Sequence, residues 1–156
     1  IKQMAEKYSE YKNFLFLGRG INYPVALEGS LKLKEITYIH SEACPAGEMK
    51  HGVNALLSEN FPVLGILTKN SLYDKMRSSV EEVRARKSPV LLLVNEEVDF
   101  DSQELTNDVM FVPKTIEILE PLLNTVVLQL LAYYTAVKLG RDVDRPRNLA
   151  KSVTVE

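Results

Sequence analysis

The chain has 156 residues, of which 46% are hydrophobic and 26% are charged, and its formal net charge is −2. This composition is typical of an ordinary soluble globular domain with one core. The small net charge excludes a general attraction to nucleic acid or to an anionic membrane, so small molecules and protein surfaces are the expected partners. The longest apolar run is far shorter than a membrane span and no signal peptide opens the chain, so a cytoplasmic protein is expected.

Cysteine and histidine are scarce. The single cysteine, Cys44, excludes an internal disulfide and suits a reducing compartment; it is expected to be a small buried packing residue. Because Cys44 is the only cysteine and His40 and His51 are the only histidines, no zinc-type ligand cluster can be assembled convincingly. The chain begins at Ile1 within a charged, helical stretch, which indicates a piece of a longer protein.

Helices and short apolar strands alternate along the chain. Residues 2–11 are expected to form the end of a helix, and residues 13–17 form a nearly all-apolar strand. That strand stops at a Gly-Arg-Gly sequence over residues 18–20. A tight turn is favoured there, because the sequence matches neither a Walker pattern nor a dinucleotide-binding pattern. Pro24 suits the first turn of a helix that extends over residues 25–39.

The middle of the chain continues the same alternation. Residues 45–52 are rich in turn formers and lead to a short helix near residues 55–57. Ser71, with Asp74 three residues on, resembles a capping box at the start of another helix. The predicted buried stripe of that helix consists of Leu72, Met76, Val80 and Val83. Three further strands are predicted, at residues 62–67, at 89–94 and, more weakly, at 109–112.

The last predicted helix, residues 121–138, is apolar nearly all round. Such a helix is covered on more than one side, here by the sheet and by another lobe or subunit. Gly140 ends it, and residues 142–156 have no helical period and are expected to form an extended C-terminal tail. Short apolar strands separated by helices favour a parallel sheet in a doubly wound α/β fold, with residues 1–156 as a single domain.

The helix over residues 25–39 has its charges in an unexpected place. Glu28, Lys32 and Glu35 fall between two apolar edges, within an arc of about 60°. The edges consist of Leu27, Leu31 and Tyr38 and of Val25, Leu33 and Ile36. The opposite face, expected to be solvated, carries Ala26, Ser30, Lys34 and Thr37. Burying a charge is costly unless it is paired and hydrogen-bonded, so this arrangement indicates a protected polar pocket. The alternative is a surface salt-bridge ladder, because residues three and four apart on a helix are neighbours.

Two more residues are candidates for chemistry. His51 lies in a polar loop between Gly47 and Gly52. It is either a surface residue or a proton carrier, because imidazole changes its charge near neutral pH. Lys151 lies in the terminal segment, near the apolar Leu149. Chain ends fray by default, yet a lysine held in a partly dry place loses its charge readily, as a Schiff-base amine requires.

Five motifs occur in order along the chain. They are Leu-Gly-Arg-Gly at 17–20, Ala-Leu-Glu-Gly at 26–29, Leu-Lys-Leu-Lys-Glu-Ile at 31–36, Gly-Glu-Met-Lys-His-Gly at 47–52 and Pro-Arg-Asn-Leu-Ala-Lys-Ser-Val-Thr-Val-Glu at 146–156. Together they resemble the glucosamine-6-phosphate synthase family, also called glutamine–fructose-6-phosphate aminotransferases (isomerising). The resemblance covers almost the whole chain and is to the second of the two sugar-isomerase (SIS) lobes. It implies an SIS-type, flavodoxin-like version of the doubly wound fold.

The resemblance also implies a function. In the family, fructose 6-phosphate becomes glucosamine 6-phosphate with ammonia that a separate glutaminase domain releases from glutamine. Glu35 would be the base that moves a proton between C1 and C2 of the sugar, and Lys151 would form a Schiff base with the open-chain ketose. His51 would assist ring opening in the neighbouring subunit, which implies a homodimer. Lys32 and Glu28 would complete the polar pocket beside Glu35. No metal or organic cofactor would be needed, because the lysine itself would supply the imine.

Two departures limit what this chain is expected to do alone. Val53 and Asn54 follow the His51-Gly52 pair, where the family has a Pro-Leu-type continuation. The Ser/Thr-rich loop that binds the sugar phosphate belongs to the first lobe, and neither that loop nor the glutaminase with its N-terminal cysteine is found here. The fragment is therefore expected to be inactive by itself.

Three alternatives stay open. The chain could be an SIS phosphosugar isomerase or deaminase, a non-catalytic module that senses a sugar phosphate, or a lobe that acts only in dimerisation. A sensor has no chemical need for Glu35 together with Lys151, and no basic recognition helix is visible.

Overall fold

The computed structural model describes residues 1–96 and 105–149. Within them, one parallel sheet has the strand order β2-β1-β3-β4-β5. The strands are β1 (Asn13–Gly18), β2 (His40–Pro45), β3 (Val63–Leu67), β4 (Val90–Asn95) and β5 (Val109–Val112). The order reverses direction between β1 and β3, as in flavodoxin-like sheets. The prediction of a doubly wound, parallel α/β fold is confirmed.

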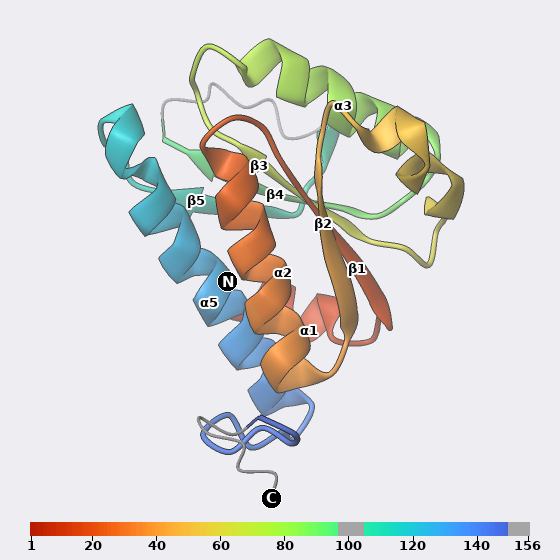
Figure 1. The fold of residues 1–156 in the computed structure, drawn as a ribbon, viewed down its shortest axis with the longest axis vertical. Coiled ribbons are helices and arrows are strands. Elements are labelled where there is room, and N and C mark those ends of the chain that lie inside the picture. Colours follow the sequence, from red (N-terminus) through yellow and green to blue (C-terminus); the bar gives the residue numbers. More distant parts are fainter. Residues whose placement is uncertain (97–104, 150–156) are drawn as a thin grey trace, which may run out of the picture.

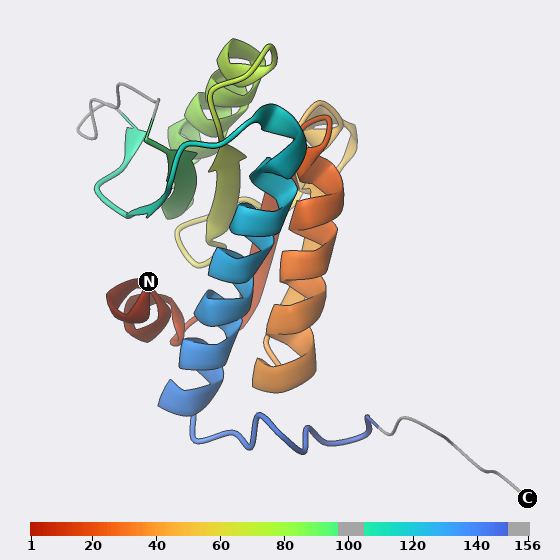
Figure 2. The same cartoon turned by 90° about the vertical axis from the view of Figure 1, so that its left-hand side faces the viewer.

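Helices cover both faces of the sheet. The α-helices are α1 (Lys2–Tyr8), α2 (Asn22–Thr37), α3 (Tyr73–Ala85) and α5 (Glu120–Lys138). Short 3₁₀ helices are η1 (Met49–His51), η2 (Val53–Leu56) and η3 (Glu117–Leu119). Figures 1 and 2 show α2 and α5 side by side in one layer, with α3 on the other side of the sheet. The core accordingly has two parts, one under α1, α2 and α5 and the other under α3 and η1.

The central strands separate these two parts of the core. On β1, Phe14 and Phe16 point into the part under α2 and α5, whereas Leu15 and Leu17 point into the part under α3. This alternation is the period of two that a strand imposes on its side chains. Cys44 is 8% exposed and belongs to the α3 side of the core, so its predicted role as a packing residue is confirmed.

Sequence reasoning missed β2. Its sequence, His-Ser-Glu-Ala-Cys-Pro, has no apolar run, and the strand lies at the edge of the sheet, where it pairs with β1 alone. Its hold on the domain is partly polar: the Ser41 hydroxyl donates a 2.7 Å hydrogen bond to the Ser30 carbonyl oxygen of α2. The passage from 45 to 52 then contains η1, and η2 occupies residues 53–56 in place of the helix predicted near 55–57.

The capping box at Ser71 is also wrong. The N-cap of α3 is Leu72, with no side-chain cap, and the Asn70 amide oxygen instead accepts the Leu72 N–H at 2.9 Å. An asparagine two residues before the helix cap therefore shapes its entry. The predicted stripe holds at Met76, Val80 and Val83, which are buried, whereas Leu72 is only half-buried. The first helix ends at Tyr8, three residues before its predicted end at residue 11.

The long helix α5 ends at Gly140 as predicted. Gly140 has φ +65°, and the N–H groups of Gly140 and Arg141 donate to the carbonyls of Val137 and Ala136. This pair of bonds is a Schellman motif, which needs a left-handed residue at this point. Among residues 1–96 and 105–149, no helix combines the length and apolar character needed to cross a bilayer.

Candidate active site

The inner face of α2 is built from small residues. The residues of α2 buried against α5 and the sheet include Ala26, Gly29, Ser30, Leu33 and Thr37. A Cβ on Gly29 would lie 2.5 Å from Leu128 Cδ1, so α5 approaches α2 more closely than any larger residue there permits. The prediction that Ala26, Ser30 and Thr37 face water is wrong. The hydroxyl groups of Ser30 and Thr37 are satisfied by internal hydrogen bonds, so burying them carries little penalty.

The outer face of α2 carries the charges together with two exposed leucines. Leu27 and Leu31 are 44% and 41% exposed. The side chains of Glu28, Lys32 and Glu35 are 36%, 33% and 26% exposed. The charges are thus half-buried, and they lie between these two exposed leucines and the buried side of the helix.

Glu28, Lys32 and Glu35 form one ionic network. The Lys32 ammonium lies 2.7 Å from Glu35 Oε2 and 3.8 Å from Glu28 Oε1. The hydrogen bond to Glu35, opposed by partial burial and aided by the charge of Glu28, raises the pKa of Lys32 above its usual range. Lys32 therefore stays an ammonium, and it holds the Glu35 carboxylate in one orientation.

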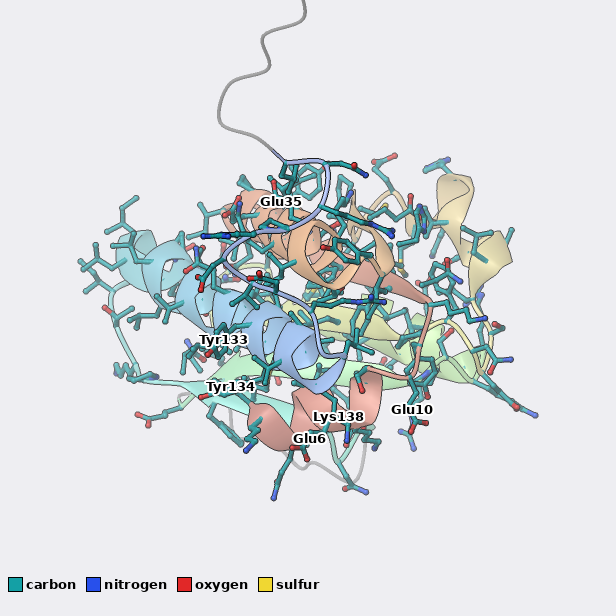
Figure 3. The ribbon with its side chains drawn as sticks, turned by 90° about the horizontal axis from the view of Figure 1, so that it is seen from below. Glu6, Glu10, Glu35, Tyr133, Tyr134 and Lys138 are labelled. Atoms are coloured by element: carbon teal, nitrogen blue, oxygen red, sulfur yellow. The ribbon has the colours of Figure 1, made fainter. Side chains whose placement is uncertain are left out.

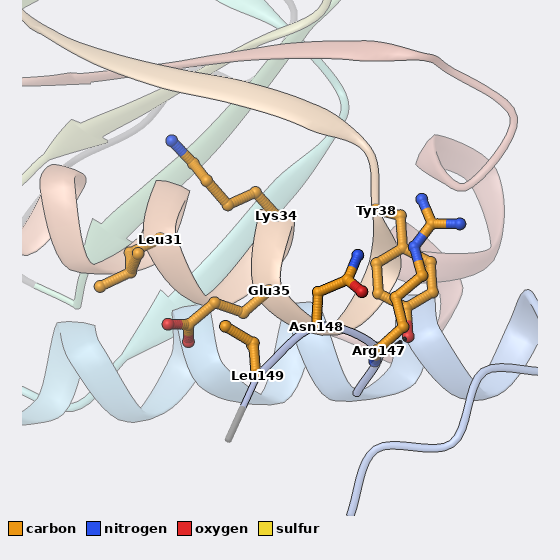
Figure 4. Close-up of a pocket in the computed structure, with 7 residues that line it drawn as sticks. All are labelled: Leu31, Lys34, Glu35, Tyr38, Arg147, Asn148 and Leu149. Atoms are coloured by element: carbon orange, nitrogen blue, oxygen red, sulfur yellow. Dashed lines mark hydrogen bonds between the residues drawn. The ribbon is translucent and has the colours of Figure 1, made fainter. Parts of the chain in front are cut away.

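Glu35 opens onto a hollow of about 330 Å³ at the C-terminal end of α2. The hollow is lined by Leu31, Lys34, Glu35 and Tyr38 of α2 and by Arg147, Asn148 and Leu149. Figure 4 shows Leu149 beside the stem of Glu35, and Arg147 over the ring of Tyr38. In Figure 3 the segment after α5 passes from the end of that helix to α2 on the side where Glu35 lies. Residues more than a hundred positions apart in the chain thus share one surface.

Tyr38 also lines this hollow. The sequence predicts it only as part of an apolar edge. It is the C-cap of α2, in the left-handed conformation with φ +66°. Its phenol oxygen accepts the Arg147 backbone N–H at 2.9 Å. The guanidinium carbons of Arg147 and Arg141 lie 4.1 Å and 5.1 Å from the centre of its ring. The only signal in the sequence is an arginine-rich segment near the chain end, which does not say which aromatic ring it meets.

A second hollow of about 500 Å³ continues along the same side of α2. It is lined by Pro24, Leu27, Glu28, Ser30, Leu31, Lys34, Glu42 and Ala43. Leu31 and Lys34 line both hollows. The outer face of α2 therefore presents two carboxylates of its own and Glu42 of β2 to a recess large enough for a small polar molecule. A fixed carboxylate beside an ammonium can accept and return a proton at such a place.

His51 does not join this group in the part of the chain that the structure describes. The His51 side chain is 75% exposed, and its Nε2 lies 3.8 Å from Glu48 Oε2. Since α2 runs back from the carboxyl ends of the strands to their amino ends, Glu35 lies at the opposite end of the sheet from η1, which carries His51 (Figure 1). Lys151 lies outside the described residues, so its predicted position stays a prediction. Residues 1–96 and 105–149 hold no group of three or more His, Cys, Asp or Glu side chains placed to bind a metal ion.

Comparison of the sequence with known proteins gives consistent matches. A family model described as SIS domain matches residues 7–139. The protein named glutamine–fructose-6-phosphate aminotransferase (isomerizing) from Thermus thermophilus is 54% identical over 156 residues, and the match covers 100% of this chain and 26% of that protein. The protein of the same name from Aquifex aeolicus is also 54% identical, with the same coverage. The chain thus spans about a quarter of the length of these relatives.

Solved structures agree. The C-terminal domain of glucosamine-fructose-6-phosphate aminotransferase from Francisella tularensis superposes with a TM-score of 0.84 and 40% identity, covering 92% of this chain and 40% of that one. Tagatose-6-phosphate ketose/aldose isomerase from Escherichia coli has a TM-score of 0.74 at 16% identity, covering 89% of this chain and 39% of that one. The sugar isomerase domain of an RpiR transcription factor from Sphaerobacter thermophilus has a TM-score of 0.71 at 17% identity, covering 88% and 79%. The last two share the fold alone, which serves both an enzyme and a regulator.

Proposed function

The chain belongs to the SIS domain family, and on this premise we propose that it is the second sugar-isomerase lobe of a glutamine–fructose-6-phosphate aminotransferase. The whole protein would convert fructose 6-phosphate and glutamine-derived ammonia to glucosamine 6-phosphate in the cytoplasm. The observation that carries the proposal is the hollow in which Glu35 meets residues 147–149, only two positions before Lys151. Relatives 51–54% identical over the full chain support the choice of reaction.

The proposed chemistry needs a base and an amine at one place. The Lys151 amine would attack C2 of the open-chain ketose, release water and leave an imine, and ammonia would then displace the lysine from C2. Glu35 would take a proton from C1 and return it to C2, while the proton of the C1 hydroxyl passes to the imine nitrogen, which leaves the amine at C2 and the aldehyde at C1. Lys32, 2.7 Å from Glu35, holds that carboxylate in place, and Glu28 holds Lys32 from its other side. The lysine supplies the imine itself, so this scheme requires no organic cofactor.

His51 fits a role in a neighbouring subunit. Its side chain is exposed, and η1, which carries it, follows the carboxyl end of β2, at the end of the sheet away from Glu35. In a homodimer, His51 of one subunit could assist ring opening at the Glu35 hollow of the other.

The exposed apolar side of the domain supports the proposed companion lobe. On α5, Leu122, Val126, Leu130, Tyr133 and Val137 recur at helical spacing and are 37–65% exposed. Figure 2 shows α5 beside α2, whose Leu27 and Leu31 are also exposed. Several large apolar side chains exposed on neighbouring helices are typical of a face that another unit covers. We propose the first SIS lobe as that unit, with the glutaminase domain elsewhere in the same long chain.

The test of the proposed function is chemical trapping of the imine. In the complete protein, borohydride added with fructose 6-phosphate should fix the sugar to Lys151, and peptide mapping should locate it. Lys151→Arg should abolish the adduct, whereas Lys138→Arg, on the exposed end of α5, should leave it. An adduct on a different lysine removes the role assigned to Lys151. A non-catalytic sensor would bind the sugar phosphate and form no adduct, and robust turnover by the 156-residue chain alone would contradict the need for the first lobe.

The subunit assignment of His51 has its own test. Homodimers carrying Glu35→Gln and homodimers carrying His51→Asn are each expected to be inactive. Random mixing of the two subunits should restore about a quarter of wild-type activity, because half of the dimers are mixed and one of their two sites is intact. No recovery after subunit exchange would place His51 in its own subunit's site, or outside any site.

A further inference from the structure

We propose that Tyr38 is a positioning residue: it fastens the segment after α5 to the end of α2, and so sets where the Lys151 amine can reach relative to Glu35. The contacts of Tyr38 with Arg141 and Arg147 join the two segments. The consequence of this fastening for Lys151 rests on the proposed function.

The backbone of Tyr38 adopts a conformation that is uncommon for a residue with a bulky side chain. Tyr38 ends α2 in the left-handed conformation, with φ +66° and ψ +13°, and its N–H donates to the Lys34 carbonyl at 3.2 Å. Glycine is the residue that usually occupies this position, because a side chain makes the left-handed conformation unfavourable. A bulky aromatic residue there works against the helix end, so the reason for its presence lies in its side chain.

The side chain of Tyr38 contacts two points of the same segment. The phenol oxygen accepts the Arg147 N–H at 2.9 Å, and the Arg147 guanidinium lies 4.1 Å from the ring centre. Arg141, directly after the end of α5, lies 5.1 Å from the same ring. Neither arginine forms an ion pair with another residue in the part of the chain that the structure describes, so the ring is their common anchor.

The segment between the two arginines is stiffened by its own turn. The carboxylate of Asp142 accepts the N–H groups of Asp144 and Arg145 at 3.0 Å and 3.1 Å. An aspartate that bonds backbone two and three residues ahead fixes a turn locally. With both ends held at Tyr38 and a turn between them, the path from α5 to the Glu35 hollow is defined.

Chain geometry links this anchor to the proposed chemistry. Lys151 follows Arg147 by four positions, and four residues of extended chain span at most about 14 Å. Glu35 precedes Tyr38 by three positions on the same helix, a rise of about 4.5 Å. Holding Arg147 at Tyr38 therefore limits the distance between the amine of residue 151 and the Glu35 carboxylate. Without the anchor, the terminal segment loses this limit and the two groups meet less often.

The decisive variant is Tyr38→Gly in the complete protein. Glycine adopts the left-handed conformation freely, so the helix end is kept and only the anchor is lost. We expect kcat and the rate of borohydride trapping on Lys151 to fall about 30-fold, with a small change in the KM for fructose 6-phosphate. Tyr38→Phe keeps the ring and loses the acceptor for Arg147, so its loss should be smaller, about threefold to tenfold. Tyr23→Leu, a half-buried tyrosine at the other end of α2, is the matched control, within about twofold of wild type.

A second readout follows the anchor itself. Trypsin cleavage after Arg147, relative to cleavage after the exposed Lys87, should rise about tenfold in Tyr38→Gly, because the Arg147 N–H and guanidinium are released. Equal acceleration at both sites would mean general loosening and would overturn the proposal. Wild-type kcat and trapping rate in Tyr38→Gly would overturn it as well, since a purely structural cap is served at least as well by glycine. If wild-type protein forms no adduct on Lys151, the proposed function fails, and the cleavage ratio still decides whether Tyr38 holds the segment.

Discussion

The two faces of α2 differ in a way that separates stability from chemistry. The inner face is lined by Ala26, Gly29 and Ser30, packs against α5 and the sheet, and contains no charge. The outer face carries the Glu28–Lys32–Glu35 network beside the exposed Leu27 and Leu31, and residues 147–149 line the hollow at its end. One helix thus supports the fold on one side and presents candidate proton-transfer groups on the other. Substitutions on the two faces are therefore expected to have opposite consequences.

The largest expected effect is on the outer face. Glu35→Gln in the complete protein should lower fructose 6-phosphate isomerisation about 10³-fold, because an amide cannot accept the proton from the sugar. Glutamine hydrolysis should continue, and the unfolding midpoint should stay near that of wild type, since the amide oxygen can still accept from Lys32. Parallel assays of glucosamine 6-phosphate and glutamate formation check this. Glu6→Gln on α1 is the matched control, and normal isomerisation by Glu35→Gln would remove Glu35 as the base.

The inner face is expected to show the reverse pattern. Gly29→Leu forces a side chain into Leu128, because a Cβ at residue 29 would lie 2.5 Å from Leu128 Cδ1 and Leu128 is only 1% exposed. Such overpacking should lower the free energy of unfolding by about 1–3 kcal/mol. Leu27→Ala on the outer face should change it by less than about 0.5 kcal/mol in the same 156-residue chain. Urea unfolding of both variants measures the difference, and equal losses would mean that the two faces are not distinct.

The inner face is also where sequence reasoning fails most clearly. A helical wheel groups Leu27 and Leu31 into an apolar edge and places the small residues on a solvated face, whereas the structure exposes the leucines and buries the small residues. Close packing against α5 requires small residues at the contact, and a helical wheel contains no information on the distance to a neighbouring helix. Under the proposed arrangement the first lobe covers the two leucines, so nothing within this domain has to.

The sheet is easier to predict. The strands β1, β3 and β4 can be predicted from their continuous apolar runs, because a strand covered on both faces has apolar residues at nearly every position. By contrast, β2, at an edge of the sheet, has a polar sequence without the apolar run that would predict a strand. The charged triplet at 28, 32 and 35 follows from helical spacing alone. The arrival of residues 147–149 beside Glu35 does not, because contacts between distant parts of a chain leave no periodic signal.

A smaller effect should appear on the outer face only in the larger protein. Leu27→Ser should leave the unfolding free energy of the 156-residue chain nearly unchanged, because Leu27 is already 44% exposed. If the first lobe covers this surface, the same change should destabilise the complete protein by about 1–2 kcal/mol through lost burial. Thermal unfolding of both forms measures the contrast. An identical, negligible shift in both would show that Leu27 stays in solvent and that the companion lobe packs elsewhere.

The smallest expected effect concerns the ion pair between Lys32 and Glu35. Its bond to Glu35 raises the Lys32 pKa above the ordinary value of 10.5, so the pair stabilises the fold fully below that value and less as pH rises through the higher folded pKa. Lys32→Met should therefore cost a few tenths of a kcal/mol at neutral pH, and this cost should shrink above pH 10.5. Lys34→Met, at an exposed position of the same helix, is the matched control for the loss of a lysine side chain. A double-mutant cycle with Lys32→Met and Glu35→Gln isolates the interaction free energy of Lys32 with Glu35, because Glu35→Gln removes the negative charge that pairs with Lys32. If the loss of unfolding free energy in Lys32→Met stays unchanged above about pH 11, it comes from the aliphatic part of the Lys32 side chain. The ion pair between Lys32 and Glu35 would then contribute nothing measurable to stability.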